Sequence, residues 1–133
     1  MAELYFNELC RKSRRPDISA GSAGVCAWGG APISRPAAEV MAKYGIDGAK
    51  FRSRRFSPEL AGECDLIIAM TAAHRRDMAL IAPEAASKTH LMLEYGAGGG
   101  DVPDPFGGST ADYMRVFSVM RPALDNLAGM LLK

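Results

Sequence analysis

The chain has 133 residues, of which 48% are hydrophobic and 23% charged, and these proportions are typical of one globular domain with its own core. The formal net charge of +1 argues against a dedicated nucleic-acid binder, and no apolar run is long enough to predict a membrane span. The three cysteines, Cys10, Cys26 and Cys64, are odd in number and widely spaced, which favours free thiols and a cytoplasmic location.

Helical and strand-like patterns alternate along the first half of the chain. Apolar residues recur at helical spacing over residues 2–10, and Pro16 ends that helix. Residues 18–23 are small and mostly apolar, which makes them a candidate strand. Ser34 begins a second helix, which Gly45 ends.

The same alternation continues in the second half. Ser57 opens a short helical turn, and the apolar run at residues 66–70 is the strongest strand candidate. Thr71 caps a helix that runs to about residue 81, and residues 89–93 predict a second buried strand. Helices that alternate with short apolar strands predict an α/β fold with a parallel sheet, here in a single domain over residues 1–133.

The C-terminal helix has both a start signal and an internal breaker. Ser109 and Asp112 form a pair that resembles a capping box, with Asp in place of the usual Glu or Gln. Apolar residues then recur at helical spacing as far as Leu131. Pro122 lies inside this pattern, and its missing N–H and its ring predict a kink or a division of the helix near Ser118.

A series of short motifs runs through the whole chain in one order. They are Met-Ala-Glu at 1–3, Ser-Ala-Gly at 22–24, Trp-Gly at 28–29, a segment at 37–47 that ends in Gly-Ile-Asp, FRSRRFSPEL at 51–60, DLIIAM at 65–70 and DVPDPFGG at 101–108. Together they resemble the low-molecular-weight protein tyrosine phosphatase family, and the last motif is the most specific. The resemblance implies a small three-layer, doubly wound parallel sheet. It also implies hydrolysis of phosphate monoesters through a cysteinyl-phosphate, with no cofactor and no metal.

The resemblance assigns roles to three residues. Asp104 matches the general acid that protonates the leaving tyrosyl oxygen. Trp28 and Phe106 match the aromatic walls around a phosphotyrosine ring, and Phe106 replaces a more usual Tyr. The residues alone leave alternatives open, because an aspartate beside proline and glycine is common in turns and a lone tryptophan commonly packs in a core.

One essential part of the family pattern comes before the first residue of this chain. Family members begin with a hydrophobic strand and a loop of the form Cys, five residues, Arg, Ser, Pro, and Met-Ala-Glu follows. This chain begins at that Met, so we expect it to lack the first central strand, the nucleophilic cysteine and the phosphate-binding arginine. The cysteines at 10, 26 and 64 do not replace them, because the residues six positions later are Pro, Pro and Met. We therefore expect this chain to be inactive, whereas a full-length form would act on a phosphotyrosine protein or another phosphomonoester.

Several alternatives stay open at this point. The missing strand and Cys–Arg loop have two explanations. One is a gene start assigned to an internal Met, which we favour, and the other is a true short variant. Without its central strand, the sheet would have a slot between residues 18–23 and 66–70, where buried N–H and C=O groups would lack partners. We expect either closure of the two strands or, preferably, a homodimer.

The alternative function is a non-catalytic binding module that acts through its surface or its dimer face, with neither nucleic acid nor membrane as a partner. Arsenate reductase is disfavoured, because no cysteine follows Arg75. The preference for phosphotyrosine or phosphoarginine depends on residues beside the missing cysteine.

The remaining charged residues favour structural interpretations. We interpret Asp101 as a solvated loop charge and Arg54 as a solvated side chain, with support of the active-site loop as the alternative for Arg54. Arg75 and Arg76 predict a solvated helix face. The two histidines lack the spacing of metal ligands.

Overall fold

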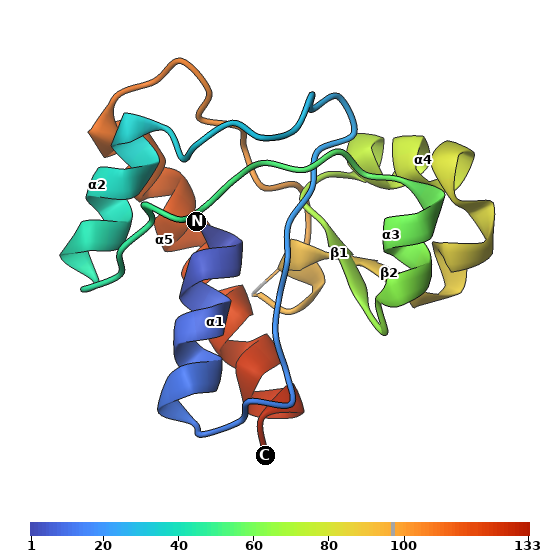
Figure 1. Cartoon of the computed structure of the whole chain (residues 1–133), viewed down its shortest axis with the longest axis horizontal. Helices are drawn as coiled ribbons and strands as arrows, with labels where there is room; N and C mark the ends of the chain where they lie inside the picture. Colours follow the sequence, from blue (N-terminus) through green and yellow to red (C-terminus); the bar gives the residue numbers. More distant parts are fainter. Residues whose placement is uncertain (97) are drawn as a thin grey trace.

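Two short parallel strands lie between two groups of helices in the computed structural model, which describes residues 1–96 and 98–133 (Figure 1). Strand β1 (Ile67–Ala69) pairs in parallel with β2 (Thr89–Leu91). Helix α4 (Ala72–Ile81) and the 3₁₀ turn η1 (Pro83–Lys88) connect the two strands, as parallel pairing requires. The predicted α/β class with a parallel sheet is confirmed.

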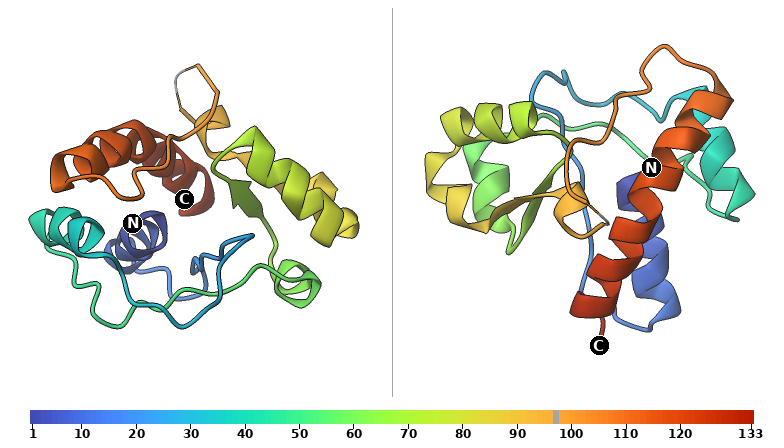
Figure 2. Two further views of the ribbon diagram at one scale, coloured as in Figure 1. Left: turned by 90° about the horizontal axis from the view of Figure 1, so that it is seen from above. Right: turned by 180° about the vertical axis from the view of Figure 1, so that it is seen from behind.

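Helices cover both sides of this strand pair, which gives three layers (Figures 1 and 2). On one side, α1 (Ala2–Lys12) and α2 (Arg35–Lys43) both pack against the long helix α5 (Thr110–Leu131). On the other side lie α3 (Pro58–Glu63) and α4. A short 3₁₀ turn, η2 (Met92–Glu94), follows β2 and contacts α5.

Three helix starts follow the capping signals in the sequence, whereas Ser34, the predicted cap of α2, makes no capping hydrogen bond through its side chain. The Ser57 hydroxyl accepts a hydrogen bond from the Leu60 N–H at 3.1 Å, and Thr71 Oγ1 accepts one from the N–H three residues later at 3.0 Å. Ser109 and Asp112 bond reciprocally, so the predicted capping box of α5 is confirmed.

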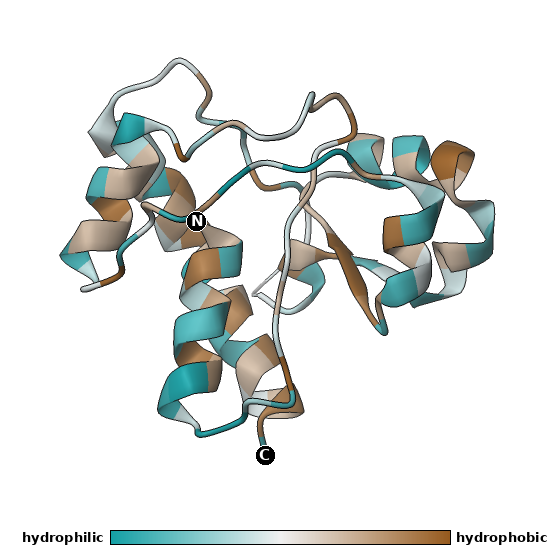
Figure 3. Cartoon of the chain, in the orientation of Figure 1, coloured by the Kyte–Doolittle hydropathy of each residue, from teal (hydrophilic) through white to brown (hydrophobic). Residues whose placement is uncertain are grey.

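The larger of two hydrophobic clusters fills the space between α1, α2 and α5. Phe117 lies at its centre with no exposed surface, and its ring meets Tyr5 and Tyr44 edge-on, at centroid distances of 5.2 and 5.0 Å. A smaller cluster, which includes Ile67 and Met78, joins β1 to α4. Figure 3 shows the corresponding pattern, with hydrophobic β1 in brown and α1 banded in brown and teal.

A polar group borders the larger cluster. The Tyr5 hydroxyl donates to Asp125 at 2.7 Å and accepts from Arg121 Nε at 3.2 Å, while the Arg121 guanidinium lies 5.1 Å from the centre of the Tyr44 ring. Burial, and then the hydrogen bond to Asp125, raise the pKa of Tyr5 above its ordinary value. Because the folded-state pKa is the higher one, the stabilising contribution of neutral Tyr5 is present below about pH 10 and is lost as the pH rises further.

Pro122 does not divide the C-terminal helix. Helix α5 runs without interruption from Thr110 to Leu131, so the predicted division near Ser118 is wrong. The Ser118 hydroxyl bonds to the Met114 carbonyl at 2.8 Å, and packing of the apolar face of α5 against α1 and α2 holds the helix together on both sides of the proline. Among the described residues no helix, α5 included, has the length and apolar character needed to cross a membrane.

The predicted strand at residues 18–23 does not form. The structure records only an isolated parallel bridge just after it, between Gly24 and Arg55. The backbone of Ala20 bonds instead to a helix side chain, because Asn7 donates to its carbonyl at 2.9 Å and accepts from its N–H at 2.7 Å. Among the described residues β1 therefore has one strand partner, β2, and the expected closure of two strands is not observed.

Removal of the Phe117 ring tests the packing of this core. We expect Phe117→Ala to lower the free energy of unfolding by about 3–5 kcal/mol, because it leaves a cavity at the contact of three helices. Val119, in the same helix, is 44% exposed, and Val119→Ala should change the stability by less than about 0.5 kcal/mol. Urea denaturation followed by circular dichroism measures both, and equal effects would contradict this assignment of the core.

Candidate functional site

Three loops gather at one end of the molecule, where β1 ends (Figures 1 and 2). They comprise residues 24–31, 49–56 and 101–109. Helix α1 begins at this end and runs away from it, so the positive end of its dipole points toward the loops (Figure 1). The carboxyl ends of parallel strands are the usual place for ligand sites in α/β proteins, so this end of the molecule is the candidate site.

The loop that carries Asp104 is fixed to the end of β1. The Val102 N–H donates to the Met70 carbonyl at 2.8 Å, directly after the strand. Further along, the Phe106 N–H donates to Asp104 Oδ1 at 3.0 Å, and this bond fixes the carboxylate to the backbone of its own loop. Asp104 is thus a turn aspartate, as one alternative predicted, and it is also exposed at the carboxyl end of the sheet. The two interpretations are compatible.

Asp101 has a partner that the sequence did not reveal. Its Oδ1 accepts a hydrogen bond at 2.9 Å from the N–H of Ala72, the first residue of α4. Asp101 is exposed on its loop, as predicted, and its carboxylate also caps α4 together with Thr71. No local signal predicts this contact, since the two residues are 29 positions apart.

The loop that carries Trp28 is closed at both ends by the segment at 53–56. At one end, the Gly24 N–H donates to the Arg54 carbonyl at 2.9 Å, and the Phe56 N–H donates to the Gly24 carbonyl at 3.0 Å. At the other end, the Gly30 N–H donates to the Ser53 carbonyl at 2.7 Å, and the Ser53 N–H donates to the carbonyl of residue 31 at 2.7 Å. The loop therefore has a fixed base.

The two predicted aromatic walls are exposed. Trp28 is 96% exposed and Phe106 is 88% exposed, although the large hydrophobic residues of the core are almost fully buried. Core packing of Trp28, one alternative from the sequence, is therefore wrong. The loops that carry Trp28 and Phe106, residues 24–31 and 101–109, lie at the same end of the molecule (Figure 1), and among the described residues no aromatic contact joins the two rings.

Arg54 is exposed, and its guanidinium lies against Gly21. Its Nε donates to the Ser22 carbonyl at 3.3 Å, and its guanidinium covers Gly21, where an added Cβ would lie 2.0 Å from Nη2. The Ser22 hydroxyl donates in turn to Glu3, in the first turn of α1, at 3.0 Å. Arg54 and Glu3 thus hold the end of the segment at 18–23 against α1, a contact that sequence reasoning missed.

None of the three cysteines is followed six residues later by an arginine. Cys10 is buried in the last turn of α1, at the end of the helix remote from the loops, and burial raises the pKa of its thiol. Cys64 donates to the Leu60 carbonyl at 3.2 Å. Cys26 is exposed on the Trp28 loop, but the sequence has no arginine six positions after it.

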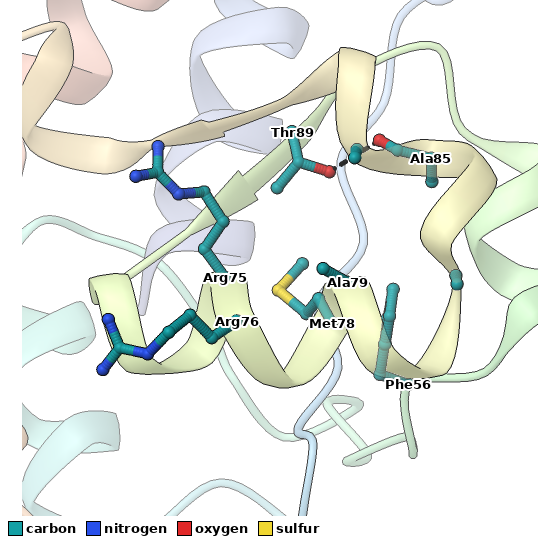
Figure 4. A pocket seen from close by; sticks show the side chains of 9 residues that line it. Phe56, Arg75, Arg76, Met78, Ala79, Ala85 and Thr89 are labelled. Carbon is teal, nitrogen blue, oxygen red and sulfur yellow. Dashed lines mark hydrogen bonds between the residues drawn. The ribbon is translucent and has the colours of Figure 1, made fainter.

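A cavity of about 350 Å³ lies elsewhere, between α4 and η1 (Figure 4). Phe56, Met78 and several alanines form its apolar wall, and the side chains of Arg75 and Arg76 border it (Figure 4). Arg75 and Arg76 are exposed on α4, as the predicted solvated helix face requires, and Arg75 also pairs with Glu94 at 3.6 Å. The cavity contains none of the predicted site residues, and in the part of the chain that the structure describes no three potential ligands gather for a metal ion.

The cap that Asp101 provides can be tested by substitution. We expect Asp101→Ala to lower the free energy of unfolding by about 1 kcal/mol, because the first N–H of α4 loses its acceptor. Asp101→Asn keeps an acceptor oxygen and should recover most of the loss. Urea denaturation gives both values, and equal destabilisation by Ala and Asn would show that the hydrogen bond is not the cause.

Comparison with known proteins agrees with this architecture. The family described as low molecular weight phosphotyrosine protein phosphatase matches residues 1–133. The low molecular weight protein-tyrosine-phosphatase Etp of Escherichia coli (strain K12) is 29% identical, over 96% of this chain and 97% of that protein. A protein-arginine-phosphatase of Geobacillus stearothermophilus is 32% identical, over 90% of this chain and 81% of that protein.

A solved structure has the same fold. The low molecular weight protein tyrosine phosphatase from T. tengcongensis superimposes with a TM-score of 0.90 at 34% identity, over 98% of this chain and 88% of that chain. The match of the family to every residue, the identity to curated relatives and the shared fold lead to one conclusion. The chain belongs to the low-molecular-weight phosphotyrosine protein phosphatase family.

Proposed function

We propose that this chain carries the general-acid and aromatic half of a phosphotyrosine phosphatase site, and that these 133 residues alone do not hydrolyse phosphomonoesters. One observation carries the proposal. The loop of the exposed Asp104 carboxylate is bonded to the carboxyl end of β1 and also carries exposed Phe106, whereas the sequence contains no cysteine followed six residues later by arginine.

Asp104 supplies the acid chemistry in this proposal. It gives a proton to the tyrosyl oxygen as the bond from that oxygen to phosphorus breaks, and then takes a proton from the water that attacks the phosphorylated enzyme. The hydrogen bond to Oδ1 leaves Oδ2 to carry the proton. Trp28 and Phe106 line the two sides of the substrate ring in this proposal, which their exposure on separate loops supports.

The nucleophilic half needs a group that the described residues lack. A thiolate that attacks phosphorus requires a lowered pKa, which backbone N–H groups, a helix N-terminus and an arginine provide together. The N-terminus of α1 faces the loops, but Cys10 is buried at the other end of that helix with a raised pKa. We therefore propose that activity requires a Cys–five residues–Arg loop ahead of Met1, encoded upstream.

Turnover of p-nitrophenyl phosphate tests whether activity requires this additional loop. We expect no activity from the 133-residue chain and activity from a form extended upstream in the genomic reading frame. In the extended form, Asp104→Asn should lower kcat by about 10²–10⁴-fold, because the leaving group loses its acid. Parallel assays with phosphotyrosine and phosphoarginine distinguish the two substrate classes, tyrosine and arginine phosphate, for which the relatives are named. Activity of the short chain that is lost on Asp104→Asn would contradict the proposal, as would an extended form that is inactive.

A second function is favoured by the sheet itself. Among the described residues β1 pairs with β2 on one edge only, and Ile68 of β1 and the adjacent Met70 are only partly buried. A two-stranded sheet is marginal by itself, and an open strand edge is a template for another chain. We propose that the short chain forms a homodimer through the open edge of β1 and acts, in that form, as a non-catalytic binding module.

Light scattering after size exclusion tests the dimer. We expect twice the monomer mass of 14.2 kDa at tens of micromolar, a concentration well above the micromolar range. Ile68→Lys should give the monomer, because a charged side chain on an edge strand opposes strand pairing. His90 lies opposite Ile68 on β2, so His90→Lys is the matched control and should stay dimeric. A monomer mass for the unchanged chain would overturn the proposal.

A further inference from the structure

One basic cluster of the protein lies on the segment that is bonded to the Trp28 loop. Residues 48–58, named here the basic segment, contain four basic side chains and no acidic one: Lys50, Arg52, Arg54 and Arg55. The whole chain has 16 Lys and Arg and 15 Asp and Glu residues, so the remainder has 12 basic and 15 acidic side chains. Residues 9–16 also contain four basic side chains, but two of them, Arg11 and Arg15, pair with Glu8 and Asp17, whereas no ion pair of the described residues involves the basic segment.

Three of these cations have no acidic partner among the described residues. Lys50, Arg52 and Arg55 are exposed, and the ion pairs of the structure involve other residues. Arg52 donates only to backbone carbonyls, those of Ala49 and Phe51, at 3.1 and 2.6 Å. Arg54 is also exposed, but its guanidinium lies against Gly21 and donates to the Ser22 carbonyl.

The basic segment and Trp28 form one platform. Four backbone hydrogen bonds, of 2.7–3.0 Å, join residues 53–56 to both ends of the Trp28 loop, and the Ser53 hydroxyl accepts a further bond from residue 31 at 2.9 Å. A tryptophan that is 96% exposed on a fixed loop, beside arginines without acidic partners, has the composition typical of a binding hot spot. Rigid presentation lowers the entropy that a partner must lose on binding.

We propose that this platform, defined by Lys50, Arg52, Arg55 and Trp28, binds acidic residues that flank the phosphorylated side chain of a protein substrate. The inference rests on the proposed phosphatase function and adds a substrate class to it, phosphoproteins with Asp- or Glu-rich sequence around the phosphorylated residue. An acidic peptide complements a short run of cations with an adjacent aromatic ring. A nucleic acid needs a longer track of positive charge, and here the rest of the chain is net negative.

Binding of an unphosphorylated peptide isolates this surface from catalysis. Fluorescein-labelled Glu-Asp-Glu-Tyr-Glu-Asp-Glu is titrated with the 133-residue chain by fluorescence anisotropy at about 50 mM salt, where exposed charges are weakly screened. Its Gln/Asn counterpart is the neutral probe. We expect the acidic peptide to bind at least about 10-fold more tightly, and the double variant Arg52→Glu/Arg55→Glu to lose about 10-fold in affinity.

A double variant of equal charge change is the control. Lys12→Glu/Arg76→Glu alters exposed residues of α1 and α4 that lie outside the platform, and it should change the affinity by less than about 2-fold. Circular dichroism establishes that both variants fold. Equal losses in the two variants would overturn the proposal, because net charge alone would then explain binding. Tighter binding of a labelled oligothymidylate with the same charge would overturn it in favour of a nucleic-acid partner.

The outcomes also separate this inference from the proposed function. Peptide binding that depends on Arg52 and Arg55, with an extended form that stays inactive, would contradict the phosphatase proposal and leave the acidic-peptide platform established. An active extended form that binds the acidic and neutral peptides equally would overturn the platform alone.

Discussion

The parallel pairing of β1 with β2 is the constraint on which the position of the candidate site depends. The residue directly after β1, Met70, accepts the hydrogen bond that anchors the Asp104 loop, and the next residue, Thr71, caps α4. Asp101 then joins the loop to the same helix start. The Asp104 loop and the beginning of α4 are therefore both attached to the end of β1. A slip of β1 by one residue would turn its buried side chains outward and move both, since side chains alternate along a strand.

Stability and binding capacity lie in different parts of the chain. The fully buried large side chains, such as Phe117 and Met41, lie among α1, α2 and α5, where three helices share their apolar faces. The exposed aromatic rings lie on loops whose backbones are fixed by hydrogen bonds. Loops on a rigid scaffold are where binding residues concentrate, because changes there do not disturb the core. The helices of this chain thus determine its stability, and its loops determine what it can contact.

Local chemistry was predictable from the sequence, and long-range pairing was not. The caps at Ser57, Thr71 and Ser109 were predicted correctly, because a cap depends on residues within one turn. The strand predicted at 18–23 failed, because a strand needs a partner, and in the described part of the chain the one isolated bridge nearby joins Gly24 to a residue 31 positions away. The motifs predicted the family and the loop that carries Asp104. The exposure of Trp28 and the cap from Asp101 depend on contacts between distant loops, which no local pattern encodes.

The bonds between Asn7 and Ala20 bear on the order of folding. The side-chain amide imitates a neighbouring strand, since it accepts from the N–H and donates to the carbonyl of one residue. The two residues are 13 positions apart, so the chain closes a short loop to form this contact. The cost of closing a loop rises with its length, and contacts of short sequence separation form with less delay. The contact between α1 and residues 18–23 can therefore form early in folding. The basic segment, about thirty residues further along, then closes the Trp28 loop on an extended segment that is already docked on α1.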